Sequence, residues 1–138
     1  MPFGVCVETW VSVALFIDSV PSEYGRLHGH DYKIRVCVEG EPRSGLVLDH
    51  YLLLRVLRSC LERVDHHNLN EVLDTRNATA EALVSYIHRC LSPRLPVSVA
   101  LVYVEACTAT GMCSYYREEP TREPVIREKL SQPPCTGG

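Results

Sequence analysis

Two histidines separated by a single glycine are the side chains in this sequence best suited to holding a metal ion. His28 and His30 lie in the segment RLHGHDYKIRVCVEG, whose alternation of apolar and polar residues predicts a β-strand. Residues two apart in a strand point to the same face and lie about 6.5–7 Å apart along the backbone. Both imidazoles can therefore approach one metal ion. The alternative is a pair of surface histidines beside a turn, because so short a motif often occurs by chance.

The composition indicates one domain with a hydrophobic core and argues against two classes of partner. The chain has 138 residues, of which 46% are hydrophobic, and a formal net charge of −3. Its 14 basic residues are scattered, so we expect no nucleic-acid partner and no membrane partner. Glu8 and Asp18 interrupt the apolar N-terminal stretch, which we therefore interpret as a buried strand and not as a leader or a membrane span.

The seven cysteines form no CxxC pair and no dense framework. This usage predicts that most of them are buried thiols in a cytoplasmic protein. Cys60 and Cys90 fall on two predicted helices, and they are one pair that a disulfide-tolerant thermophile could bond. Spacing alone does not determine the connectivity.

The pattern of apolar residues predicts four strands and two helices. The strands cover residues 5–18, 28–40, 97–105 and 113–116, and the helices run from Tyr51 to about Val64 and from Thr79 to about Cys90. Because both helices lie between two pairs of strands, we expect an α+β fold in which they cover one face of an antiparallel four-stranded sheet. We expect one domain over residues 1–116 and, over 117–138, a proline-rich, charged tail that is extended or disordered.

Five segments, in their order and spacing, resemble the 6-pyruvoyltetrahydropterin synthase and 6-carboxytetrahydropterin synthase family. They are RLHGHDYKIRVCVEG, SGLVLDHYLLL, LERVDHHNLN, NATAEALVSYI and VYVEACTA, and the resemblance covers about residues 10 to 116. It implies a tunnelling fold with the order β-β-α-α-β-β. In such a fold, subunits join their sheets into an oligomeric β-barrel, as a homo-oligomeric trimer or hexamer with active sites between subunits.

The resemblance also implies a zinc ion held by three histidines and a pterin substrate, dihydroneopterin triphosphate or a close relative. His28 and His30 match two of the zinc ligands. Asp65 and His66 match a pair that transfers protons, in which the carboxylate raises the basicity of the imidazole and fixes its tautomer. The alternative for this pair is a helix C-terminal cap.

Two further residues match positions that bind the pterin. Glu105 matches the glutamate that accepts hydrogen bonds from the donor edge of the pterin, and Thr108 is expected to add one hydrogen bond. A glutamate that closes an apolar strand is otherwise simply its solvent-exposed end. Asp49, Thr79 and Glu81 are expected to serve the fold, as residues at helix N-termini.

Two departures from the family pattern bear on activity. Leu15 aligns with the first zinc histidine of the family, and no histidine precedes His28. With two imidazoles instead of three, we expect zinc binding to be weak or absent unless another residue contributes. Tyr24 occupies the position of the family's cysteine base, and the adjacent Glu23 offers a carboxylate base instead.

These features leave two hypotheses for the function. The first is a pterin-processing lyase of this family, which removes triphosphate from the side chain of its substrate or cleaves that side chain. The alternative is a non-catalytic or diverged paralogue that binds a pterin or serves as a structural subunit.

Overall fold

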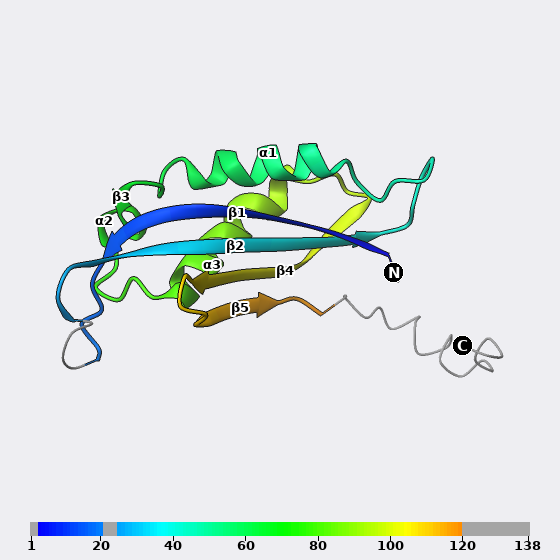
Figure 1. Ribbon diagram of the computed structural model, residues 1–138. Helices are drawn as coiled ribbons and strands as arrows, with labels where there is room; N and C mark the ends of the chain where they lie inside the picture. The colour runs from blue at the N-terminus through cyan, green and yellow to red at the C-terminus, as the bar shows by residue number, and fades with distance from the viewer. Residues whose placement is uncertain (1–2, 21–24, 120–138) are drawn as a thin grey trace, which may run out of the picture.

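The computed structural model describes residues 3–20 and 25–119, which form one five-stranded sheet with helices on one side (Figure 1). The strands lie in the order β3-β1-β2-β4-β5. Their bounds are β1 (Gly4–Leu15), β2 (His28–Gly40), β3 (His67–Asn68), β4 (Val99–Thr108) and β5 (Cys113–Arg117). The helices are α1 (His50–Leu61), α2 (Leu69–Leu73) and α3 (Ala80–Leu91), followed by a 3₁₀ turn, η2 (Ser92–Arg94).

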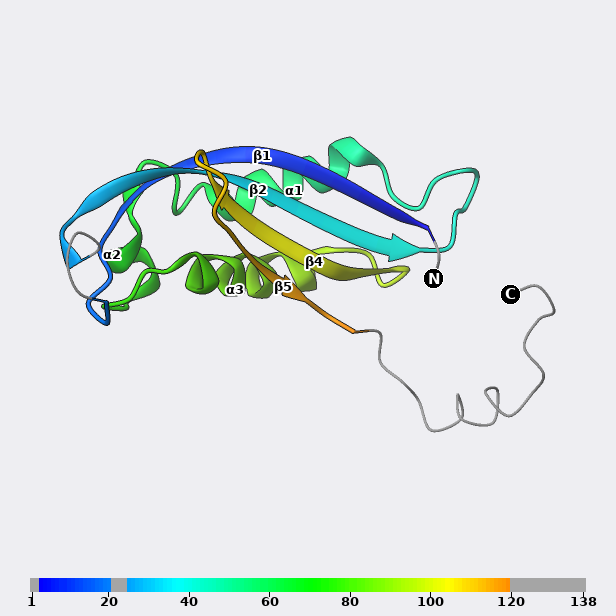
Figure 2. The ribbon, with the colours of Figure 1, turned by 60° about the horizontal axis from the view of Figure 1, so that its bottom comes forward.

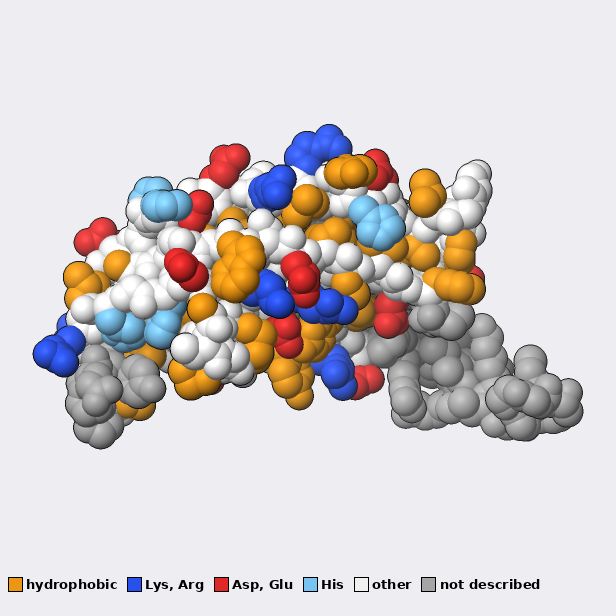
Figure 3. Space-filling model, in the orientation of Figure 1, with side chains coloured by type: hydrophobic (Ala, Val, Ile, Leu, Met, Phe, Trp, Pro, Cys, Tyr) orange, Lys and Arg blue, Asp and Glu red, His pale blue; other side chains and the backbone are white. Residues whose placement is uncertain are grey.

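The two faces of the sheet have different chemistry because side chains alternate along each strand. On one face Ile34, Val36 and Val38 of β2 are fully buried, and α1 and α3 cover this face (Figures 1 and 2). Leu53 of α1 and Ile87 of α3 are fully buried in the same core. No helix of the described chain covers the opposite face, which we call the open face. There, acidic and basic side chains are interleaved with hydrophobic ones (Figure 3).

The four predicted strands and two predicted helices are present, and the α+β class is confirmed. The expectation of four antiparallel strands is wrong, because β3 adds a short parallel pairing to β1, with His67 opposite Val13. A strand of two residues has no period to detect, and neither does the five-residue helix α2, whose N-cap is Asn68. Within the described residues the sheet is open and ends at β3 and β5. The barrel was expected from the joined sheets of several subunits and stays a prediction.

The residues expected to serve the fold cap the two long helices. The Asp49 carboxylate accepts a hydrogen bond from the backbone N–H of Tyr51 at 2.9 Å, and the Thr79 hydroxyl accepts one from Ala82 at 3.0 Å. Glu81 lies in the first turn of α3 and accepts a hydrogen bond from the Ser114 hydroxyl at 3.1 Å. This contact connects the start of α3 to β5.

Six cysteines form disulfides, so the expectation that most are thiols is wrong. The bonded pairs are Cys6–Cys37, Cys60–Cys90 and Cys107–Cys113, whereas Cys135 lies outside the described residues. The pair singled out on the two helices is confirmed. The other two join residues that face each other across neighbouring strands, a proximity that exists only once the register is known.

Disulfides are typical of oxidising compartments and also of intracellular proteins of hyperthermophiles. The cytoplasmic location therefore stays a prediction, as does the tail, of which residues 120–138 lie outside the described part of the chain. None of the helices in that described part is long and apolar enough to cross a membrane.

We expect the Cys60–Cys90 disulfide to stabilise the fold, because it joins α1 to α3 across a sequence separation of 30 residues. Replacing both cysteines by alanine should lower the free energy of unfolding by about 3–4 kcal/mol, the chain-entropy value for a loop of this length. Urea denaturation of the oxidised proteins measures this difference. In the presence of a reductant, the free energies of unfolding of the two proteins should differ only by the contribution of the packed sulfur atoms that alanine lacks. An unchanged midpoint under oxidising conditions would contradict the assignment.

Candidate active site

The two histidines of the HGH motif lie side by side at the start of β2. The ring centroids of His28 and His30 are 4.9 Å apart, with the rings nearly perpendicular at 88°. Nδ1 of His28 lies 2.7 Å from the carbonyl oxygen of Arg26. Since a carbonyl can only accept, Nδ1 is the protonated nitrogen of this ring. The ring of His30 also lies against Tyr32, at 5.4 Å.

The surroundings of His30 favour its neutral form. Burial is the main cause that lowers the pKa of His30 below its usual value of 6.5, and the neighbouring His28 adds to it. Asp31 acts in the opposite direction but does not cancel the effect. At neutral pH, His30 is therefore an uncharged imidazole that can accept or donate a hydrogen bond.

An aliphatic side chain occupies the place of a third imidazole. In the antiparallel ladder Leu15 lies directly opposite His28, and Val13 lies opposite His30. Directly opposed residues share a face of the sheet, so Leu15 points to the same side as both histidines, where it is fully buried. Among the described residues, no cluster of three potential metal ligands includes either histidine. These donors therefore do not fit a three-histidine zinc site.

The Asp65–His66 pair lies in the turn after α1 and is attached to β1. Oδ1 of Asp65 accepts a hydrogen bond from the backbone N–H of Ser12 at 2.9 Å and lies 3.1 Å from Nδ1 of His66. The backbone N–H of His66 donates to the carbonyl of Ser12 at 2.6 Å. One carboxylate thus anchors the turn and also orients the imidazole. The structural and catalytic interpretations of this pair are therefore compatible.

The backbone of His66 is in an unfavourable conformation. Its φ is 61°, in the left-handed region that costs a non-glycine residue of this kind about 1 kcal/mol or more. Its side chain is 79% exposed. The fold thus holds an exposed imidazole in a strained turn beside a carboxylate, which is a feature that functional sites often show.

A shallow pocket of about 580 Å³ brings part of the predicted site together. It is lined by residues of β1, the start of β2 and the turn before β3, and it includes both His30 and His66. Asp31 lines the same pocket, and its carboxylate accepts a hydrogen bond from the Ser12 hydroxyl at 2.6 Å. His30 and His66, distant in sequence, therefore border one space.

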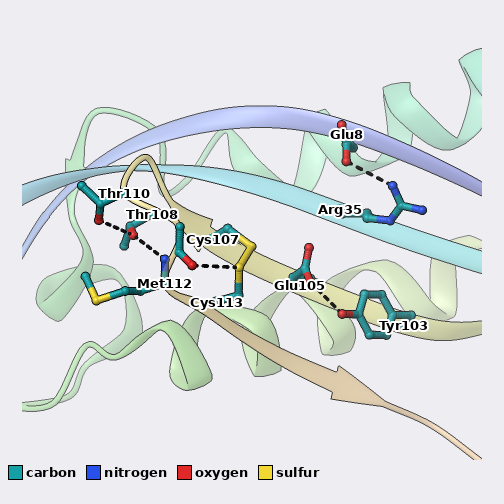
Figure 4. Close-up of a disulfide and its surroundings, with 10 residues drawn as sticks. Glu8, Arg35, Tyr103, Glu105, Cys107, Thr108, Thr110, Met112 and Cys113 are labelled. Atoms are coloured by element: carbon teal, nitrogen blue, oxygen red, sulfur yellow. Dashed lines mark hydrogen bonds and ion pairs between the residues drawn. A yellow bond between two sulfur atoms is a disulfide. The ribbon is translucent and has the colours of Figure 1, made fainter.

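Glu105 lies on the open face of β4, directly opposite Arg35 of β2. Its Oε2 accepts a hydrogen bond from the Tyr103 hydroxyl at 2.7 Å (Figure 4). The pKa of Tyr103 is raised to about 12. Desolvation is the main cause, and the hydrogen bond to Glu105 and the charge of that carboxylate add to it. The Tyr103 ring stacks on Tyr115 at 5.5 Å, and the Arg117 guanidinium lies within 6 Å of both rings. The carboxylate is thus held in place by a rigid aromatic neighbour.

A pocket with a volume of about 730 Å³ is lined by Glu105. Its lining combines two aromatic side chains, Trp10 and Tyr103, with three basic ones, Lys33, Arg35 and Arg117. These five residues were not among the expected site residues. The alternation of β2 and β4 could have identified Lys33, Arg35 and Tyr103, since each shares strand parity with Glu105 or with its cross-strand partner.

The predicted site residues fall into two groups within one chain. His30 and His66 border one pocket, and Glu105 borders another. Thr108 lines the Glu105 pocket and also a third pocket that includes His30. Its hydroxyl accepts a hydrogen bond from the backbone N–H of Met112 at 3.0 Å and so serves the turn before β5. Glu23 and Tyr24 lie outside the described residues, so their roles stay predictions.

The sequence matches a family model described as 6-pyruvoyl tetrahydropterin synthase over residues 5–119. The chain belongs to this pterin-processing family. It is 37% identical over 79 residues to the dihydroneopterin monophosphate aldolase of Pyrococcus furiosus, a match that covers 57% of this chain and 68% of that protein.

Solved structures support the same fold. The 6-pyruvoyl tetrahydropterin synthase of Caenorhabditis elegans superposes with a TM-score of 0.70 at 23% identity, over 85% of this chain and 96% of that one. The corresponding protein of Plasmodium falciparum superposes with a TM-score of 0.64 at 19% identity, over 84% and 98%. Both comparisons concern the fold alone.

We expect Leu15→His to create a zinc site, because it would add the third imidazole on the face that carries His28 and His30. The purified variant should retain about one zinc per chain after dialysis, as measured by elemental mass spectrometry. Leu15→Gln is the matched control, since it buries a polar group at the same position without an imidazole. Equal and low zinc contents in the two variants would show that position 15 does not face both histidines.

Proposed function

We propose that the chain is a carbon–carbon lyase that cleaves the side chain of a dihydroneopterin phosphate, most simply the monophosphate. The observation that carries the proposal is the burial of Leu15 opposite His28, which leaves two imidazoles where the family's zinc chemistry needs three. The 37% identity to a dihydroneopterin monophosphate aldolase supports the same reaction.

Side-chain cleavage suits this set of donors for a chemical reason. In a 7,8-dihydropterin the C6=N5 double bond is conjugated with the ring and adjoins C1′ of the side chain. When the bond between C1′ and C2′ breaks, its electron pair can move into this C=N bond. The substrate thus supplies the electron sink that a metal ion would otherwise provide. The proposed steps therefore need protein side chains and no metal ion.

His66 is the proposed base, and Asp65 is its positioning residue. With Nδ1 held at 3.1 Å from Asp65, Nε2 can take the proton of the 2′-hydroxyl. The C1′–C2′ bond then breaks, C2′ becomes the carbonyl carbon of glycolaldehyde phosphate, and the electron pair passes to C6=N5. A proton delivered to C1′ yields 6-hydroxymethyl-dihydropterin. The proton removed at the start balances the proton delivered at the end.

The group that delivers this second proton is proposed from the sequence. Tyr24 replaces the family's cysteine, and a tyrosine with an ordinary pKa of about 10 is protonated at neutral pH. It therefore suits a proton donor better than a base. Glu23 is the second candidate, as a carboxylate at the adjacent position. The neutral His30 would hydrogen-bond the side-chain hydroxyls in the same pocket.

Glu105 is proposed to hold the pterin. Its carboxylate can accept hydrogen bonds from the amino and N3–H groups of the pterin, and Trp10 offers an aromatic face in the same pocket. Lys33 and Arg35 supply positive charge for the phosphate. The cross-strand contact of Arg35 with Glu8, at 3.1 Å, would be adjusted by a bound phosphate.

The separation of the two pockets supports a site shared between subunits. Among the described residues, β3 pairs with only the last part of β1. On that side of β1, residues 4 to 12 pair with no other described strand, and β5 forms the opposite edge of the sheet. Pairing the β1 edge of one subunit with the β5 edge of another would extend the sheet. A homo-oligomer built in this way would bring the Glu105 pocket of one chain towards the histidines of its neighbour.

Binding without turnover is the second candidate function. It is favoured by the two replacements, Leu15 for the zinc histidine and Tyr24 for the cysteine. In that case Glu105 would still hold a pterin, but the side chain would stay intact.

The two functions are separated by incubation with dihydroneopterin monophosphate, and in parallel with the triphosphate, followed by chromatography of the pterins. We expect 6-hydroxymethyl-dihydropterin and glycolaldehyde phosphate from the monophosphate. His66→Asn should lower kcat by about 100-fold or more, because it removes a general base. Asparagine tolerates a positive φ, so this variant keeps the turn while losing the imidazole.

Glu105→Gln in the same assay tests the pterin contact. Losing a charged hydrogen-bond acceptor should raise KM by about 10- to 100-fold. Glu8→Gln is the control, since it removes a carboxylate from the same face that is not assigned to the pterin. Pterin binding with no cleaved product from either ester would refute the lyase and favour the binding function. Unchanged kinetics of both His66→Asn and Glu105→Gln would refute the assigned roles.

A further inference from the structure

We propose that Glu105, Cys107 and Cys113 form a binding site for a thiophilic divalent metal ion when the Cys107–Cys113 disulfide is reduced. This site is distinct from the histidine pair at the start of β2. It does not depend on the proposed lyase activity.

Glu105 lies beside the Cys107–Cys113 disulfide on the open face (Figure 4). The ligand atoms of these three side chains all lie within 4.8 Å of one another, and no other group of three such side chains is found in the described part of the chain. Cys107 and Cys113 are directly opposite in the β4–β5 ladder, and Glu105 is two residues before Cys107 on the same face. Both strands belong to the sheet, so the framework that presents the ligands is rigid.

The types of donor match a zinc site. Zinc takes thiolate sulfur at about 2.3 Å and carboxylate oxygen at about 2.0–2.2 Å in a tetrahedral arrangement. In that geometry two sulfur ligands are about 3.8 Å apart. Reduction must therefore let the two sulfurs separate, and the carboxylate oxygen, which lies within 4.8 Å of both sulfurs, must approach the same ion. Three protein ligands leave a fourth position, which faces the pocket of about 730 Å³.

The surroundings of the cluster support a metal site in two ways. The Tyr103 hydroxyl donates to Oε2 of Glu105 at 2.7 Å, and a second contact of this kind typically orients a carboxylate that binds a metal. Lys33 lies directly opposite Cys107 in the β2–β4 ladder. Its positive charge offsets part of the negative charge that two thiolates and a carboxylate bring together.

Reduction is possible because one end of this disulfide is accessible. Cys113 is exposed, whereas Cys107 is 9% exposed. One thiolate of a dithiol reductant attacks the protein disulfide and forms a mixed disulfide, which the second thiolate of the reductant then attacks. The protein S–S bond breaks, two protein thiols form, and the reductant becomes a disulfide. The metal ion then displaces the two thiol protons, so the site forms only in the reduced protein.

Cys6–Cys37 provides an internal comparison. It also joins directly opposite residues on the open face, between β1 and β2. However, the nearby carboxylate of Glu8 lies 3.1 Å from the Arg35 guanidinium, and no cluster of three ligands forms at this disulfide among the described residues. A third potential ligand, Glu105, therefore lies at Cys107–Cys113, whereas none lies at Cys6–Cys37 among the described residues.

Titration with Co²⁺ tests the proposal, because thiolate ligation gives a sulfur-to-cobalt charge-transfer band that imidazole or carboxylate ligation lacks. Full-length protein is reduced with a dithiol, desalted without oxygen and titrated beside the oxidised protein. We expect one Co²⁺ per chain with this band in the reduced protein and none in the oxidised protein. Zn²⁺ should displace the cobalt and abolish the band.

Three variants assign the ligands. Cys107→Ser with Cys113→Ser should abolish the band, and the matched control, Cys6→Ser with Cys37→Ser, should retain it. Glu105→Gln should weaken Co²⁺ binding by about tenfold or more, since a ligand is lost. Circular dichroism verifies the fold of each variant.

The proposal is overturned if reduced wild-type protein shows no charge-transfer band, a result that needs no variant. It is also overturned if the band persists without Cys107 and Cys113, or if Glu105→Gln binds Co²⁺ as tightly as wild type. None of these outcomes depends on pterin cleavage, so the metal site and the lyase can fail separately.

Discussion

The pairing of β1 with β2 along the whole length of β1 is the constraint on which the rest of the structure depends. Because side chains alternate, this register decides which residues meet on each face. It places Leu15 opposite His28 on the covered face and Cys6 opposite Cys37 on the open face. A shift of one residue in β2 would move the fully buried Ile34 to the open face and both histidines away from the core.

The same register places the histidines and Glu105 on different faces of the sheet. His28 and His30 share their face with the core, and His30 lines one pocket with His66 of the turn after α1. Glu105 belongs to the other face, among aromatic and basic side chains. The proposed base His66 and the proposed substrate anchor Glu105 line different pockets, and a neighbouring subunit is proposed to unite them. The open edges at β1 and β5 offer a way to recruit one.

Much of the fold could be predicted from local patterns. The alternation in β2 and the helical spacing of α1 and α3 reflect burial on one side, which leaves a direct mark on the sequence. Asp49 and Thr79 were predictable because a helix start needs a side-chain acceptor. The parallel pairing of His67 with Val13 was not, since it depends on the path of the turn after α1.

Only part of the candidate site could be predicted from local sequence patterns. Leu15 could be matched to the family's zinc histidine because family motifs are local in sequence, and that match stays a prediction. The ladder places Leu15 opposite His28. Tyr103 and the Cys107–Cys113 disulfide were missed because their significance lies in what Glu105 contacts across strands. Such contacts follow from register, which a single sequence constrains weakly.

The central claim is that this chain cleaves a dihydropterin side chain without the three-histidine zinc site of its family. The most direct test measures the turnover of dihydroneopterin monophosphate by the disulfide-intact protein, with and without a strong chelator, alongside its zinc content. We predict 6-hydroxymethyl-dihydropterin at the same rate in both conditions, with zinc far below one per chain. Loss of activity with the chelator and its recovery on adding zinc, or no cleavage in either condition, would contradict the claim.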